Sequence, residues 1–329
     1  MIKNILVTGG AGFIGSSLVK YLTSKYNYYR IINIDDLTYA SNYKEIKKLE
    51  KLNNYSFHKL NINDVDNIEH LFSKYSFDQV IHLAAETHVD NSIKKPSAFV
   101  ETNIVGTLNL LKIANKFWTN KENKLFYHIS TDEVFGSLGQ NGLFTEDSPY
   151  DPRSPYSASK AASDHLVRSF YHTYNLPIIV SNCSNNFGPN QHKEKLIPVV
   201  INSILNNQKI PVYGDGKNIR DWIYVEDHVK AIDKILQNGI LGETYLIGGD
   251  CEFSNIDLIF KIIGITDKIL NRKKGKSEQL ISYVEDRKGH DYRYAIDHSK
   301  LKNKLSWEPS KDFDKNLVKT INWYINKSK

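Results

Sequence analysis

The chain has 329 residues, 40% of them hydrophobic and 24% charged, which is typical of a globular protein with a substantial core. Its net charge is +6, but the basic residues are scattered. The densest run, residues 272–276, lacks interleaved aromatic residues, so we expect a solvated loop and no nucleic-acid site. Two cysteines exclude a disulfide framework and a cysteine-based zinc site. We therefore expect no metal, a cytoplasmic location and, since no apolar run is long enough to span a bilayer, no membrane association.

The first predicted strand, residues 5–7, leads through a glycine-rich loop into a helical segment. The loop reads Thr-Gly-Gly-Ala-Gly-Phe-Ile-Gly over residues 8–15. Glycines at a strand-to-helix turn let phosphates approach backbone N–H groups, and the helix N-terminus adds a partial positive charge. A second strand, residues 30–34, ends at Asp35, where a dinucleotide fold places the acceptor for the adenosine ribose 2′-OH. Asp36 repels a 2′-phosphate, so the sequence predicts NAD rather than NADP.

Further strands are predicted at residues 56–60, 78–83 and 124–129, with helical stretches at 43–52 and 96–117. In a doubly wound parallel sheet the carboxyl ends of the strands line the cofactor crevice.

Two of these strand ends carry candidate contact residues. Asn61 and Ile62 either flank the adenine or form a turn and a core position. Ala84 and Ala85 are small enough to allow close approach of a ring or sugar. We expect His88 to be a contact residue rather than the catalytic base.

The most informative polar cluster follows the strand at 124–129. It contains Ser130, Thr131, Asp132 and Glu133, which places a hydroxyl and two acids where the crevice is expected. Paired carboxylates can divide acid and base roles when their environments separate their pKa values. The alternative is that Asp132 caps the next helical turn and Glu133 is solvated.

Tyr156 and Lys160 are four residues apart and therefore share one helix face. An ammonium near a phenol favours the phenolate, so we expect Lys160 to lower the pKa of Tyr156 toward neutrality. This pair would accept the proton of an alcohol whose hydride leaves to a nicotinamide.

Together these motifs resemble the extended short-chain dehydrogenase/reductase family, and more narrowly its nucleotide-sugar 4,6-dehydratases, above all those acting on dTDP-glucose. The resemblance covers nearly the whole chain. It rests on residues 8–15, on Tyr156 with Lys160, and on the stretches 35–40, 83–91, 130–136, 182–189, 194–198, 220–227 and 286–291. It implies a hydro-lyase with tightly bound NAD, a nucleotide-diphosphate glucose substrate, and homodimerisation through helices 96–117 and 156–174.

The resemblance also implies a role for each catalytic residue. Tyr156 takes the C4 hydroxyl proton while NAD accepts the C4 hydride; Thr131 bonds near O4 and Lys160 tunes the tyrosine. Glu133 removes the C5 proton and Asp132 protonates the departing C6 hydroxyl. The hydride then returns to C6, and the net change is loss of water.

The implied ligand contacts form two sets. The NAD contacts are Gly9, Gly12, Phe13, Ile14, Gly15, Asp35, Asp36, Asn61, Ile62, Leu83, Ala84, Ala85, Thr102, Tyr156, Lys160 and Asn186. The substrate contacts are Thr87, His88, Thr131, Asp132, Glu133, Asn185, Glu194, Lys195, Leu196, Pro211, Val212, Tyr213, Arg220, Asn255, Arg287, His290 and Asp291. Arg220 suits a diphosphate through bidentate bonds, or else forms a surface salt bridge with Asp221.

Related activities remain as alternatives. A UDP-sugar 4-epimerase needs no elimination pair, and a UDP-glucuronate decarboxylase typically lacks the acid at Asp132, so the intact pair favours dehydration. A non-catalytic NAD-binding regulator would be expected to have lost Thr131, Tyr156 or Lys160. Phe187 and Lys288 depart from the family pattern near the nucleotide, which leaves thymine and uracil both open.

The predicted fold class is α/β: a Rossmann-type doubly wound parallel sheet with a smaller α+β substrate-binding lobe. We place the NAD-binding domain at residues 1–183 and the nucleotide-sugar lobe mainly at 184–329, with an interleaved boundary. Strands at 210–212, 223–224 and 245–247 and a helix at 313–325 are assigned to the smaller lobe.

Overall fold

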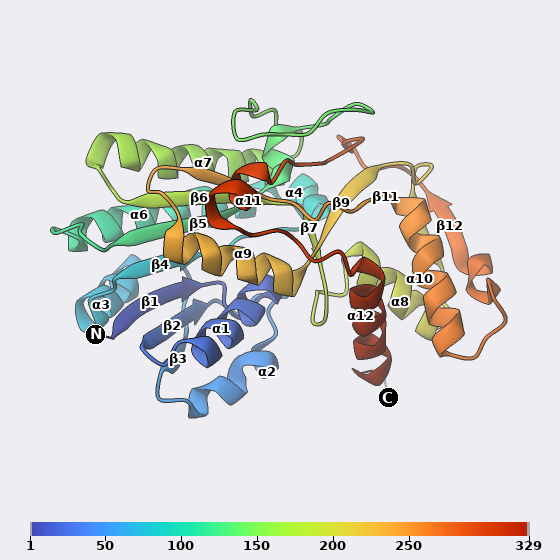
Figure 1. Cartoon of the computed structure of the whole chain (residues 1–329), viewed down its shortest axis with the longest axis horizontal. Coiled ribbons are helices and arrows are strands. Elements are labelled where there is room, and N and C mark those ends of the chain that lie inside the picture. Colours follow the sequence, from blue (N-terminus) through green and yellow to red (C-terminus); the bar gives the residue numbers. More distant parts are fainter. Residues whose placement is uncertain (1, 328–329) are drawn as a thin grey trace.

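The computed structural model describes residues 2–327 and is built on a seven-stranded sheet (Figure 1). The strands are β1 (Lys3–Thr8), β2 (Tyr29–Asp35), β3 (Tyr55–Lys59), β4 (Gln79–His82), β5 (Leu125–Thr131), β6 (Ile178–Cys183) and β10 (Thr244–Ile247). Their order is β10–β6–β5–β4–β1–β2–β3, and all neighbours are parallel. The order reverses between β1 and β4, which is where such sheets bind ligands. The predicted Rossmann-type fold is confirmed.

Helices cover both faces of this sheet (Figure 1). One face packs on α1 (Phe13–Lys25), α9 (Val225–Asn238) and α11 (Ser299–Leu305), and the other on α3 (Val65–Tyr75), α6 (Gly106–Phe117) and α7 (Pro155–Tyr174). Along β1, Ile5 and Val7 belong to the first core and Leu6 to the second. Alternate side chains therefore enter opposite cores, which is why the strands are almost wholly apolar.

The start of α7 is fixed by local sequence. Ser154 and Ser157 form a reciprocal capping box, and Pro155 occupies the first turn, where its missing N–H costs nothing. The helix ends at Asn175 in the left-handed conformation, with φ of 53°. This capping determines where the helix begins. It thereby places Tyr156 near the carboxyl ends of the sheet strands.

Two predicted helices are less regular than expected. Residues 43–52 form a short helix, α2 (Tyr43–Ile46), and a 3₁₀ segment, Lys47–Lys51. Following α4 (Val89–Lys94), the helix predicted from Pro96 consists of α5 (Pro96–Phe99), a π-helical segment at Val100–Val105, and α6. Within the π segment, buried Asn103 bonds the backbone N–H and carbonyl of Glu86 and the Ser159 hydroxyl. These tertiary bonds accompany the wider turn, as is common near functional sites.

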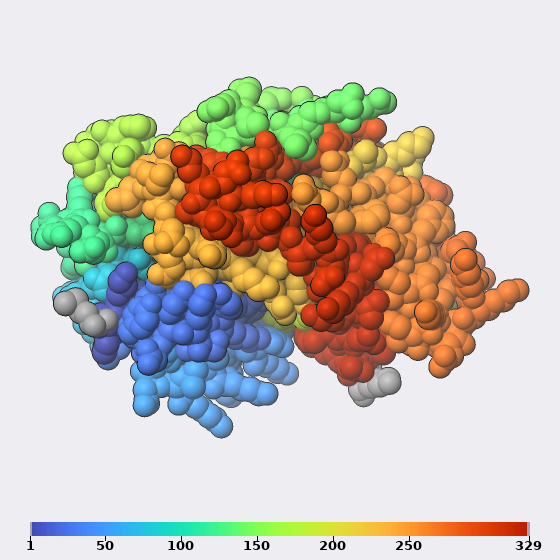
Figure 2. All heavy atoms as spheres, viewed as in Figure 1, coloured from blue at the N-terminus to red at the C-terminus, as the bar shows by residue number. Residues whose placement is uncertain are grey.

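The smaller lobe contains two short sheets and three helices. One sheet has the order β11 (Glu252–Ser254), β9 (Ile219–Tyr224), β7 (Asn185–Phe187), and the other pairs β12 (Ile281–Val284) with β8 (Ile210–Tyr213). They pack with α8 (Leu196–Leu205), α10 (Asn255–Ile269) and α12 (Phe313–Lys327) around a separate core. Figure 2 shows this lobe, in orange and dark red, beside the sheet domain.

One segment lies elsewhere than predicted. β10, assigned above to the smaller lobe, pairs with β6 at the edge of the large sheet, and α9 before it packs on α1. The alternation of apolar residues in this segment does not reveal which sheet it joins. Among the described helices none is both long and apolar enough to cross a bilayer.

Candidate active site

A cavity of about 300 Å³ opens at the carboxyl ends of β1, β4 and β5, between the sheet domain and residues 184–195. Every residue predicted to contact NAD lines it, from Gly9 in the first loop to Asn186 in β7. The topological reversal between β1 and β4 thus coincides with the cavity, as expected for a doubly wound sheet.

The glycine loop forms one wall by close backbone packing. Gly9 has a φ of +74°, and a Cβ there would lie 2.7 Å from the Ala84 nitrogen. A Cβ on Gly15 would lie 2.2 Å from the Gly9 carbonyl oxygen. Only glycine therefore allows β1, α1 and the residues after β4 to meet this closely.

Asp35 is buried behind this loop at the end of β2. One carboxylate oxygen accepts the Ala11 N–H at 2.9 Å; the other accepts the Leu37 N–H at 2.9 Å and the Ser41 hydroxyl at 2.7 Å. A carboxylate has about four acceptor positions, so one remains for a ribose hydroxyl. Asp36, beside it, accepts a hydrogen bond from Asn61 at 2.8 Å.

These features fit a dinucleotide. The N-cap of α1, Gly12, makes no side-chain bond, and the first turn carries no acid, so its N–H groups and positive dipole are free for a phosphate. Asp35 and Asp36 add negative charge at the ribose end, which disfavours a 2′-phosphate.

The other end of the cavity carries the polar cluster. Thr131 is the last residue of β5, and Asp132–Phe135 form a 3₁₀ turn. The Thr131 hydroxyl accepts the Glu133 N–H at 3.3 Å, so Thr131 caps this turn and the alternative in which Asp132 is the cap is wrong. Glu133 is half-buried rather than solvated, and both acids line the cavity with Tyr156.

The two carboxyls have different surroundings. Asp132 is 2% exposed; burial raises its pKa well above the usual range, and the charges of Glu133 and Asp221 raise it further. Burial also raises the pKa of Glu133, but the cations Lys195, Arg220 and Arg287 oppose that shift. Asp132 is therefore suited to donate a proton and Glu133 to accept one.

The tyrosine–lysine pair differs from the prediction. Burial raises the pKa of Tyr156 well above its usual range, Glu133 raises it further, and a hydrogen bond with Thr131 opposes the shift. The Lys160 ammonium donates to the Ile129 carbonyl at 2.9 Å. The predicted lowering of the Tyr156 pKa by Lys160 is wrong here, because desolvation and the carboxylates of Glu133 and Asp132 raise that pKa, and Lys160 is not among the groups that oppose the rise.

The predicted substrate residues fall into two groups. Those that line the cavity are Thr87, Thr131, Asp132, Glu133, Asn185, Glu194 and Lys195. The remaining ones lie outside its lining, and several of them surround Glu133 as charges: Arg220 and Arg287 lower its pKa and Asp291 raises it.

Arg220 is buried rather than at the surface. Its guanidinium donates to the carbonyls of Ile219, Tyr292 and Asp291 and lies 4.2 Å from the Tyr294 ring centroid. Asp221 instead accepts two backbone N–H groups, from Gly249 and Cys251. The alternative of a surface salt bridge between Arg220 and Asp221 is therefore wrong.

Arg287 bridges the two lobes. It pairs with Asp90 through Nε at 2.5 Å and through Nη2 at 3.1 Å, and it lies 5.0 Å from the Tyr213 ring centroid. His290 is held by Asp286 at 2.6 Å. His88 caps α4 by accepting the Asn91 N–H and lies 3.8 Å from Glu194.

Three predicted contacts have side chains engaged in packing or at element ends. Val212 is 2% exposed inside the smaller-lobe core, and Leu196 packs against that core. Asn255 begins α10, and its backbone N–H donates to the Asn218 carbonyl. The buried side chain of Val212 is therefore not available for a contact.

Several cavity residues were not singled out from the sequence. Ser41 holds Asp35, Glu86 follows the two alanines after β4, and Cys183 ends β6. Burial raises the pKa of Glu86, with Glu194 adding to the shift. The position of Glu86 beside Ala84 and Ala85 was the available sequence signal; Ser41 and Cys183 carried none.

Comparison with known proteins gives a consistent result. The family model described as GDP-mannose 4,6 dehydratase matches residues 6–320. A dTDP-glucose 4,6-dehydratase from Xanthomonas campestris pv. campestris is 49% identical over 326 residues, covering 97% of this chain and 92% of that protein.

Two solved structures are similar over nearly their whole length. The dTDP-glucose 4,6-dehydratase of Bacillus anthracis in complex with NAD has a TM-score of 0.88 and 43% identity, covering 99% of this chain and 97% of its own. DesIV, the dTDP-glucose 4,6-dehydratase of Streptomyces venezuelae with NAD and TYD bound, has a TM-score of 0.91 and 38% identity, covering 98% and 97%. The chain therefore belongs to the GDP-mannose 4,6-dehydratase family, alongside these dTDP-glucose 4,6-dehydratases.

Proposed function

We propose that the protein is a dTDP-glucose 4,6-dehydratase, a hydro-lyase that uses bound NAD and forms dTDP-4-dehydro-6-deoxy-glucose. The observation that carries the proposal is the joint presence of Asp132 and Glu133 beside Tyr156 in one cavity whose other end fits a dinucleotide. Elimination needs an acid and a base besides the tyrosine, whereas epimerisation does not. The similarity to dTDP-glucose dehydratases over nearly the whole chain supports the same activity.

The first step is oxidation at C4. When bound, NAD would supply the hydride acceptor at C4 and the hydride donor at C6. We assign Tyr156 as the acceptor of the O4 proton, with the Thr131 hydroxyl bonded to it. Because burial and Glu133 disfavour a free phenolate, we expect proton transfer to accompany oxidation rather than precede it.

The second step is loss of water. We assign Glu133 to remove the C5 proton, which the 4-keto group acidifies, and Asp132 to protonate the C6 hydroxyl as its bond to carbon breaks. The cations around Glu133 favour its carboxylate, whereas burial keeps Asp132 protonated. The protonated Glu133 would then return a proton to C5, and with the hydride that the cofactor would supply at C6 the product is complete.

The remaining contacts position the nucleotide. Lys195, Arg220 and Arg287 concentrate positive charge between the cavity and the smaller lobe, which suits a diphosphate. Thymine, rather than uracil, is proposed from the names of the similar enzymes.

Three further properties are proposed with the activity. We propose an NAD-binding domain at 1–183 and a sugar-nucleotide lobe mainly at 184–329, with β10 and α9 of the second range packed in the sheet domain. We propose a homodimer that uses helices 96–117 and 156–174, testable by sedimentation. We also propose a cytoplasmic location, since both cysteines, Cys183 and Cys251, are free thiols; cell fractionation tests this.

The test is incubation of purified protein with dTDP-glucose and, separately, with UDP-glucose, followed by mass spectrometry. Loss of one water from dTDP-glucose, a keto group trapped by borodeuteride, and no net reduction of NAD are the expected results. An unchanged mass with glucose converted to galactose indicates an epimerase and contradicts the roles of Asp132 and Glu133. Preference for UDP-glucose contradicts the assigned base.

A further inference from the structure

A buried polar chain lies behind Lys160, on the side away from the cavity. The Lys160 ammonium is 3.5 Å from Nε2 of His128, and the same Nε2 is 3.1 Å from Oδ1 of Asp164. His128 belongs to β5, while Lys160 and Asp164 are one turn apart on α7. Their exposed fractions are 4%, 0% and 0% in the order Lys160, His128, Asp164.

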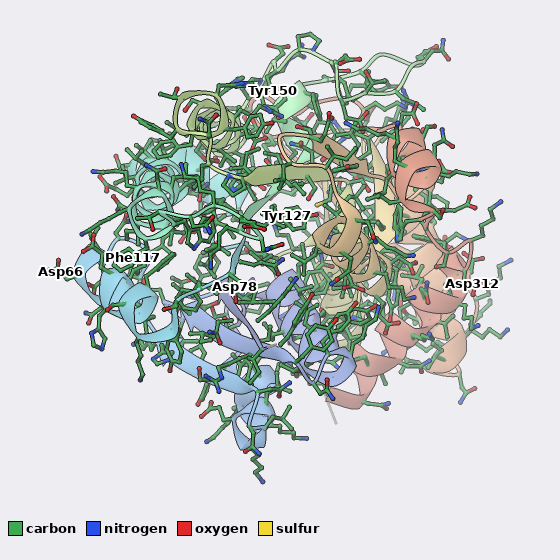
Figure 3. All side chains as sticks on the ribbon, turned by 60° about the vertical axis from the view of Figure 1, so that its left-hand side comes forward. Asp66, Asp78, Phe117, Tyr127, Tyr150 and Asp312 are labelled. Carbon is green, nitrogen blue, oxygen red and sulfur yellow. The ribbon has the colours of Figure 1, made fainter. Side chains whose placement is uncertain are left out.

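The far end of the chain is anchored near the surface. Oδ2 of Asp164 accepts the Tyr150 hydroxyl at 2.8 Å and the Asn182 amide at 3.1 Å. Arg168 donates to the Tyr150 oxygen at 2.8 Å and lies 5.1 Å from its ring centroid. Figure 3 shows Tyr150 beside α7 and Tyr127, the neighbour of His128, in the interior.

Lys160 and Asp164 both face Nε2 of His128, so the ring can form a hydrogen bond with only one of them at that atom. Burial and the charge of Lys160 lower its pKa to about 4, so the ring is neutral and carries one N–H. Nδ1 is buried and has no hydrogen-bond partner among the described residues. A proton on Nε2 faces Asp164 Oδ1, which has no other hydrogen-bond partner among the described residues, and leaves only the Nδ1 lone pair unpaired; Lys160 then donates to the Ile129 carbonyl and not to the ring. A proton on Nδ1 would leave a buried N–H and a carboxylate oxygen without hydrogen-bond partners, which costs more free energy.

Asp164 keeps its charge in spite of burial. Burial alone would raise its pKa, but the hydrogen bond from His128 together with the charges of Lys160 and Arg168 lowers it to about 2. Asp164 is also the largest of the charges that raise the pKa of Lys160, while burial lowers it. The other titratable or charged groups around Lys160 and its partners are His82 on β4, Cys183 on β6, and Tyr156 and Arg168 on α7.

We propose that Asp164, held in place by His128, is the counter-ion that keeps the Lys160 ammonium charged and oriented at the cavity. Neither His128 nor Asp164 lines the cavity, so both are positioning residues. The inference rests on the proposed function for the role of Lys160. Without the carboxylate, a buried ammonium would have only neutral or cationic neighbours behind it, and it would lose its proton at lower pH.

The test is the pH dependence of kcat/KM for dTDP-glucose in the NAD-loaded wild type and in Asp164→Asn. We expect the alkaline limb of the variant to move down by about one pH unit or more, since one close opposite charge shifts a pKa by about 1 to 3 units. The matched control is Asp233→Asn. Asp233 is 3% exposed and bonded to Tyr26 and Lys25, but it lies on the opposite face of the sheet.

Asp233→Asn is expected to lower the melting temperature and leave the alkaline limb unmoved. An Asp164→Asn profile that coincides with the wild type overturns the proposal, because a merely structural role changes stability and leaves the limb in place.

A second measurement needs neither turnover nor the Asp164 variant. Nitrogen-15 NMR of the wild-type histidine rings, with His128 assigned by loss of its signals in His128→Asn, should show a neutral ring protonated at Nε2 from pH 6 to 9. A proton on Nδ1, or a doubly protonated ring, overturns the arrangement. If the wild type fails to convert dTDP-glucose, the proposed function fails, whereas the tautomer still tests the buried chain.

Discussion

Replacing Asp132 by asparagine separates the catalytic role of this acid from its cost to folding. The side chain is 2% exposed, its Oδ2 has no partner among the described residues, and the Thr131 hydroxyl, at 3.4 Å, is the partner of Oδ1. Asparagine has nearly the same volume and never ionises. We expect Asp132→Asn to be far slower than the wild type and yet more stable at neutral to alkaline pH.

The sign of the stability effect follows from the direction of the pKa shift. The folded-state pKa of Asp132 lies above its ordinary value of 3.8, so the native state binds this proton more tightly than the unfolded chain does. The pKa shift costs no stability below about pH 3.8, and stability is lost as the pH rises toward the folded-state pKa. Each pKa unit corresponds to about 1.4 kcal/mol, so the variant should be more stable than the wild type at pH 8, by a margin that grows from pH 5 upward. Loss of the proton donor should lower kcat by about 10² to 10⁴.

The assay is urea unfolding of wild type and Asp132→Asn at saturating NAD from pH 5 to pH 9, with kcat measured in parallel. Asp164→Asn should change the free energy of unfolding in the opposite direction. The Asp164 pKa is about 2, so its charge stabilises the native state above pH 4 by about 2 kcal/mol, and the variant loses this stabilisation. A stability difference for Asp132→Asn that does not grow with pH, or a kcat within tenfold of the wild type, refutes the reasoning.

Other substitutions test the remaining parts of the site. Glu133→Gln should lower kcat/KM by about 10² to 10⁴ and abolish exchange of the C5 proton with D₂O; retained exchange would show that another group is the base. Gly9→Ala places a methyl group 2.7 Å from the Ala84 nitrogen at a φ of +74°, so the purified protein should lose NAD and at least about 1 kcal/mol of stability; normal NAD content contradicts the packing. Arg287→Ala frees Asp90 and removes a cation near Glu133, so KM for dTDP-glucose should rise at least tenfold, and an unchanged KM argues against contact with the nucleotide.

The features predicted correctly from the sequence depend on near neighbours in the chain. The glycine loop, Asp35 at the end of the second strand, and the four-residue spacing of Tyr156 and Lys160 are local patterns, and local geometry is enough to place them. The location of the polar residues after β5 is predicted in the same way, because the carboxyl ends of parallel strands lie at one edge of the sheet.

The features that only the tertiary structure decided depend on packing between distant segments. β10 could have joined either sheet by its sequence, and contact with β6 places it in the larger one. The pKa of Tyr156 lies above its usual range because residues from other elements exclude water and bring Glu133 close. The Arg220 guanidinium is held in the interior by hydrogen bonds to carbonyls more than 70 residues away along the chain. Hydrophobic and turn patterns thus determined the framework and the location of the site. Desolvation and the summed field of distant charges, which exist only once the chain is folded, determined which groups hold their protons.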